Sequence, residues 1–74
     1  MRASEFRAIR KGLGLTAYQW GKLLGYRGSA TVIKIQISRM ERARRDIPAQ
    51  VALLAESYRA NGVPRHRLAL LDVL

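Results

Sequence analysis

The basic side chains of this chain are concentrated between residues 27 and 45, where six residues are lysine or arginine and Glu41 is the single acid. Eleven of the fourteen basic residues in the whole chain are arginines. The planar guanidinium of arginine can donate two parallel hydrogen bonds to a phosphate or to the edge of a guanine. The composition of this stretch therefore predicts a surface for a negatively charged partner.

Residue types that support catalysis or metal binding are sparse. Cysteine is absent, His66 is the single histidine, and the five acids are scattered along the chain. No Ser/His/Asp or Cys/His set can be assembled, and no glycine-rich phosphate loop follows a strand. We expect a protein that is not an enzyme, holds no metal or other cofactor, and takes no small-molecule ligand.

The length and charge of the chain indicate one small domain over residues 1–74 that attracts polyanions. A domain of this size buries only about 60% of the surface that its unfolded chain exposes, so a second subunit is a plausible source of stability. A net charge of +9 would also strain a compact monomer and draw it towards polyanions. The sequence shows neither a signal peptide nor an apolar run long enough to span a membrane, so we expect a cytoplasmic protein.

The spacing of apolar residues predicts an all-α bundle of about five helices. The first helix covers residues 2–11 with Ser4 as its N-cap, and the second covers 16–24 with Thr16 as N-cap and Gly25 just past its end. A loop at 25–31 precedes a third helix that ends near residue 42. The fourth begins at Pro48 and ends at 61–62, and a short last helix follows 63–64. The predicted inward residues are Phe6, Ile9, Leu13, Trp20, Leu23, Leu24, Ile33, Ile37, Met40, Val51, Leu54, Ala55 and Tyr58. Gly21 is placed where a neighbouring helix could approach closely.

Two segments leave alternatives open. The run from Thr31 to Ile37 is rich in β-branched residues and alternates in polarity, which is also the pattern of a strand. A helix is favoured because the run continues into a helix-forming segment and no second strand exists to pair with. Tyr18 and Trp20 could form a base-stacking platform, but residues two apart on a helix point in different directions, so Trp20 is predicted to lie in the core.

The apolar residues of the C-terminal segment, 63–74, are too many for one narrow stripe. Some of them need another surface, and we expect this segment to be a dimerisation helix. The residues predicted to make the dimer contact are Leu68, Leu70, Leu71 and Leu74.

Short motifs in a fixed order resemble those of the Cro and phage-repressor type (XRE-like) helix-turn-helix domain. They are Arg10 in the first helix, Gly14-Leu15-Thr16 at the first turn, residues 23–26 at the second, and 37–41 followed by Arg44, Ile47 and Pro48. The resemblance implies a lambda-repressor-like bundle whose third helix enters the major groove of double-stranded DNA. It also implies a structural ion pair between Arg10 and Glu41.

The resemblance assigns roles to two sets of residues. The base-reading set is Lys34, Ile35, Gln36, Ser38 and Arg39. Lys34 or Arg39 suits guanine, Gln36 suits adenine, and Ile35 suits a thymine methyl group. The residues expected at phosphates are Thr16, Tyr18, Gln19, Arg27, Arg42, Arg44 and Arg45. Two departures from the family pattern stand out: Ala17 occupies a position where the family usually has a polar residue, and about six extra residues fall at 27–33 as a loop or a helix extension.

These observations favour a sequence-specific transcriptional regulator. We expect an autoregulatory repressor of phage or mobile-element type, encoded by a bacterium or phage and associated with the nucleoid, that binds an inverted-repeat operator as a homodimer. One alternative is an antitoxin-like protein-interaction module with secondary DNA binding. Another is a non-specific or RNA-binding basic module.

Overall fold

The computed structural model describes residues 1–71, apart from the side chain of Leu70, and contains helices but no strand in that range. The elements are α1 (Ala3–Gly12), α2 (Ala17–Leu23), α3 (Ala30–Glu41), α4 (Ala49–Asn61), α5 (Arg65–Leu68) and a 3₁₀ turn, η1 (Ala69–Leu71). The predicted all-α bundle of five helices is therefore confirmed. The Cα radius of gyration, 11.3 Å, agrees with the value of about 11 Å expected for one domain of this length.

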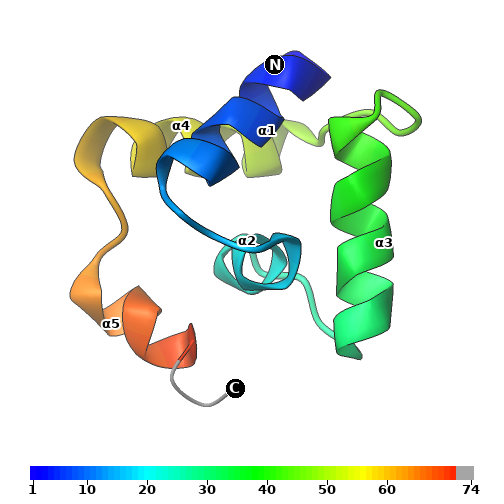
Figure 1. Ribbon diagram of the computed structural model, residues 1–74. Coiled ribbons are helices and arrows are strands. Elements are labelled where there is room, and N and C mark those ends of the chain that lie inside the picture. Colours follow the sequence, from blue (N-terminus) through cyan, green and yellow to red (C-terminus); the bar gives the residue numbers. More distant parts are fainter. Residues whose placement is uncertain (72–74) are drawn as a thin grey trace.

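The arrangement of the helices separates α3 from the C-terminal elements. In Figure 1, α1 and α4 lie above α2, which is seen end-on, while α3 stands upright on one side of α2 and α5 lies on the other. η1 packs against α2, on the side of α2 opposite to α3.

The beginnings of the helices agree only in part with the sequence prediction. Thr16 caps α2 through a reciprocal capping box, in which its hydroxyl accepts from the Gln19 N–H and its own N–H donates to the Gln19 side chain. The predicted cap at Ser4 is wrong, because α1 already begins at Ala3 after Arg2 and Ser4 lies within its first turn. Pro48 is the N-cap of α4 and lies just before its first turn.

The ambiguous run from Thr31 to Ile37 is helical, which excludes a strand there. α3 begins at Ala30, and the Ser29 hydroxyl accepts a hydrogen bond from the Val32 N–H. Residues 27–33, which the resemblance treats as an insertion, therefore form a short loop and the first turn of α3. Gly25, at φ 93°, closes α2 as predicted, in a conformation that other residues rarely adopt.

The core lies between α1, α2, α3 and α4, with Trp20 at its centre. The Trp20 ring is fully buried, with ring centroids 5.6 Å from Phe6 and 6.0 Å from Tyr58. The prediction that Trp20 belongs to the core is confirmed, and its ring is not available for stacking on bases. The Tyr58 hydroxyl donates to the Leu23 carbonyl at 2.8 Å, which satisfies a buried acceptor at the end of α2.

Gly21 sets the separation of α2 and α3. A Cβ at this position would lie 2.2 Å from Cγ2 of Ile33 and 3.2 Å from Cγ1 of Ile37. Any larger residue would push α3 away from α2, so the close approach predicted for Gly21 is confirmed.

The C-terminal segment covers the domain's own core in part. Leu71 packs against the core cluster, whereas Leu68 remains 41% exposed. At least part of the Leu71 side chain is thus buried within the monomer, although Leu71 was expected at the dimer contact. Leu74 and the side chain of Leu70, also expected at the dimer contact, lie outside the described residues. Within residues 1–71, no helix has the length and apolar character needed to cross a lipid bilayer.

Candidate nucleic-acid interface

The outward face of α3 carries an open hollow whose lining is basic. Its lining residues are Lys34, Ile35, Ser38, Arg39, Arg42 and Arg44; we call it the α3 hollow. Its orientation follows from helix geometry, because Ile33, Ile37 and Met40 lie on the opposite side of α3 and are fully buried. Four of the five residues expected to read bases therefore line the α3 hollow on the outward side of α3, and Gln36 is the exception.

The α3 hollow combines three kinds of chemistry. Four of its lining residues are cations and none is an acid, which favours an anionic partner. Ser38 adds a hydroxyl that can donate or accept a hydrogen bond. Ile35 adds an apolar side chain that is 45% exposed, unusual beside so many charges. Guanidinium and ammonium donors, a hydroxyl and a methyl-bearing surface match the features that base pairs present in the major groove.

Arg44 reaches the α3 hollow because the chain turns back sharply after α3. The Arg44 N–H donates to the Arg39 carbonyl at 2.9 Å, and the Ala43 N–H donates to the Met40 carbonyl at 3.3 Å. These two bonds form a Schellman motif, and Ala43 takes its left-handed position with φ 57°. An alanine is strained there by about 1 to 2 kcal/mol, so the surrounding contacts must hold the turn.

The end of α3 is fixed to α1 by the predicted ion pair. Arg10 Nε donates to Glu41 Oε2 at 2.7 Å and Arg10 Nη2 donates to Glu41 Oε1 at 3.1 Å. Arg10 Nη1 also donates to the Leu15 carbonyl at 3.0 Å. One guanidinium thereby joins α1, the turn before α2 and the last residue of α3. Because the Glu41 side chain is only 8% exposed, this is a largely buried structural contact.

The other predicted contact residues are spread over the molecule. Gln36 is half-buried at the edge of the core-facing side of α3 and does not line the α3 hollow. Arg27 is exposed in the loop before α3, at the end away from Arg42 and Arg44. Arg45 lines a different hollow, beside Met1 and Asp46. The structure therefore groups Arg42 and Arg44 with the base-reading set but places Arg27 and Arg45 apart from it.

The predicted contacts on α2 have partners within the domain. The Thr16 hydroxyl and the Gln19 side-chain oxygen are both used in the capping box, which leaves the Gln19 amide nitrogen free to donate outwards. Tyr18 is half-buried and packs against the core cluster. These interactions hold the start of α2 in one conformation.

Arg7 is a basic residue of this surface that the sequence motifs do not indicate. It lies on the exposed side of α1 and lines a second hollow together with Arg10, Ala17, Ser38, Glu41 and Arg42. We call this the Arg7 hollow. The one sequence signal that could have indicated Arg7 is its spacing: it precedes Arg10 by three residues, so the two lie on the same side of α1. The α3 hollow and the Arg7 hollow share Ser38 and Arg42, so they form one continuous surface.

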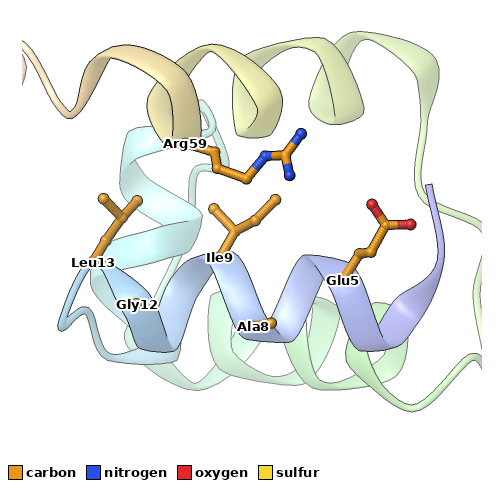
Figure 2. A pocket seen from close by; sticks show the side chains of 6 residues that line it. All are labelled: Glu5, Ala8, Ile9, Gly12, Leu13 and Arg59. Atoms are coloured by element: carbon orange, nitrogen blue, oxygen red, sulfur yellow. The ribbon is translucent and has the colours of Figure 1, made fainter.

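Another concave region, between α1 and α4, has a different character. Figure 2 shows the side chain of Arg59 from α4 extending over Ile9, with Glu5 at the far end of the same groove. Its lining has one acid, one cation and an apolar remainder, so its net charge does not favour an anion. Arg59 is also paired with Glu56 on its own helix. The basic surface around α3 is therefore the stronger candidate for a functional site.

Comparison of the chain with protein-family models, curated proteins and solved structures gives no match.

Proposed function

We propose that the protein binds double-stranded DNA by placing the outward face of α3 in the major groove. The observation that carries the proposal is the α3 hollow, whose lining combines four cations with a hydroxyl and an exposed isoleucine on the outward side of α3 and the turn that follows it. An α-helix with its side chains is about 10 to 12 Å in diameter, which fits the major groove of about 12 Å width. The order of the helix-turn-helix motifs and the net charge of +9 support the same conclusion.

Within this proposal the residues divide by chemistry. Arg39 and Lys34 are the donors for guanine, and Ile35 contacts a thymine methyl group. Arg42 and Arg44 lie at the C-terminal end of the same face and hold phosphates, which positions α3 without reading sequence. Gln36 has a smaller role than its chemistry alone suggests, because it is half-buried beside the core.

We further propose a repressor that binds an inverted repeat as a homodimer and controls its own synthesis. Leu68 and Leu53, which are 41% and 71% exposed, are apolar surfaces that a second subunit could cover. Sedimentation at tens of micromolar, with and without DNA, tests this part by itself, because a protein that stays at 8.4 kDa in both is not a dimer.

The central experiment is selection of the purified protein against random duplex DNA at physiological salt, where specific complexes exceed non-specific ones by orders of magnitude. We expect enrichment of a two-fold-symmetric motif. The variant Arg39→Ala should bind this motif about 5- to 150-fold more weakly per half-site and lose preference at one base position in each, since a good bidentate contact provides about 1 to 3 kcal/mol. Arg65→Ala is the matched control because it removes the same charge from α5, which lies away from α3 (Figure 1).

Two results would contradict the proposal. Binding at low salt without any enriched sequence would mean that the surface is merely basic, and a partner that co-purifies from the native host would then favour an antitoxin-like module. If Arg39→Ala and Arg65→Ala lose the same affinity and the base preference is unchanged, Arg39 does not read a base.

A further inference from the structure

We propose that Arg7 and Arg42 together bind one backbone phosphate at the Arg7 hollow. This inference rests on the proposed function, because the phosphate belongs to the DNA whose major groove α3 would occupy. It adds a contact from α1, a helix to which the sequence motifs assign only the structural Arg10. The ligand chemistry is a single phosphodiester with one negative charge.

The Arg7 hollow is formed where three helices meet. Arg7 and Arg10 come from α1, Ala17 is the first residue of α2, and the rest of the lining comes from the end of α3. The lining is shared with the α3 hollow through Ser38 and Arg42. An anion in the Arg7 hollow would therefore lie directly beside the proposed groove-reading face, as a phosphate at the edge of the major groove must.

The charges of the Arg7 hollow leave two cations available. Arg10 and Glu41 neutralise each other, and all three nitrogens of the Arg10 guanidinium donate to Glu41 or to the Leu15 carbonyl. In residues 1–71 neither Arg7 nor Arg42 makes a side-chain hydrogen bond or an ion pair, and both are exposed. The hollow thus offers two unpartnered guanidinium groups, which can hold one phosphate from two sides.

Ala17 explains why α1 would supply this contact. Its side chain is a methyl group that cannot donate a hydrogen bond, and it lines the hollow beside the two arginines. Its small size leaves space where a longer side chain would stand. A phosphate approaching the start of α2 can therefore reach the guanidinium groups that flank Ala17.

Arg7 and Arg42 also line a neighbouring hollow that includes Lys11. The positive charge on the exposed side of α1 therefore continues beyond the Arg7 hollow. Lys11 is exposed on the next turn of α1 and extends the positive potential to more distant phosphates. The contribution of Lys11 to the affinity should therefore decrease as the salt concentration rises, and it should not depend on any single phosphate.

The test uses the full-length protein, the duplex enriched by selection, and a series of duplexes in which one phosphate at a time is replaced by an uncharged methylphosphonate. We expect the wild type to lose about fivefold in affinity at each phosphate that it contacts, including one per half-site at the Arg7 hollow, as counterion release predicts for one phosphate at 0.15 M salt. Arg7→Ala should bind the unmodified duplex up to about fivefold more weakly per protomer, with a salt slope smaller by up to about 0.9 per protomer. The methylphosphonate penalty at that one position should then shrink, because only Arg42 remains there, while the penalties at all other positions are kept.

The controls separate this inference from the proposed function. Arg65→Ala should keep the wild-type salt slope and the wild-type pattern of penalties. Arg7→Lys, which retains the charge, should recover most of the slope and lose only the forked contact. If Arg7→Ala behaves as Arg65→Ala on an enriched duplex, the phosphate site is refuted while the DNA-binding proposal stands. If no duplex is enriched, both proposals are refuted.

Discussion

Replacing Gly21 by alanine should destabilise the domain by forcing α2 and α3 apart. The new Cβ would lie 2.2 Å from Ile33 Cγ2, so a shift of about 1.2 to 1.8 Å is needed to reach an ordinary contact of 3.4–4 Å. Ile33 cannot move aside easily, because it is fully buried and its β-branched side chain is restricted to one main rotamer in a helix. Overpacking of this kind costs about 1 to 3 kcal/mol.

This loss is large compared with the stability of so small a domain. At about 0.05 to 0.15 kcal/mol per residue, a chain of 74 residues is stable by about 4 to 11 kcal/mol. A loss of 2 kcal/mol would lower the melting temperature by about 8 to 16 °C. Thermal unfolding followed by circular dichroism measures the change directly.

Gly12→Ala is a matched control that should raise the stability of the domain instead of lowering it. Gly12 is the last residue of α1, and a Cβ there would meet nothing within 4 Å. Alanine should stabilise this position by about 0.5 to 1 kcal/mol, because glycine loses more conformational entropy in a helix. If Gly21→Ala melts at or above the wild-type temperature, or if both variants fall equally, the close approach of α2 and α3 is not limited by Gly21.

Two further substitutions test contacts that hold the site in place. Arg10→Ala should lower the free energy of unfolding by about 3 to 5 kcal/mol in denaturant titration, because Glu41 would be left buried without its partner. The double variant with Glu41→Ala should recover part of the loss, and a cost below about 1 kcal/mol for Arg10→Ala would contradict a structural role. Tyr58→Phe should cost about 1 to 2 kcal/mol, since the Leu23 carbonyl loses its buried donor. Tyr18→Phe is its control and should stay within about 0.5 kcal/mol of wild type; equal losses would show that the Tyr58 hydroxyl does not matter.

The fold could be predicted from the sequence because its main signals are periodic and local. Ile33, Ile37 and Met40 share one side of a helix by spacing alone, and all three are fully buried. Thr16 and Gly25 mark the ends of α2 through the preferences of capping positions. Residues 31–37 fit both a strand pattern and a helix pattern. The helix was predicted because the sequence contains no second strand to pair with, and the segment is helical.

The details of the candidate site were harder to predict because they depend on where helices end relative to one another. The left-handed turn at Ala43 has no glycine to mark it, so nothing local indicated that Arg44 would fold back beside Arg39. Arg45, one residue further on, points to a different hollow for the same reason. Arg7 joins Arg42 only through the packing of α1 on α3, which spacing within α1 does not reveal.

The cations around the end of α3 repel one another in the free protein, and the helix dipole reduces that cost. The C-terminal end of a helix carries about half a negative charge, which favours Arg39, Arg42 and Arg44 close by. Glu41 adds a full negative charge, but Arg10 already neutralises it. The remaining repulsion is what a row of phosphates would relieve, because a bound anion lowers the energy of the folded state and leaves the unfolded chain unchanged. The same clustering that makes the free domain less stable would therefore favour the binding of a polyanion, as proposed.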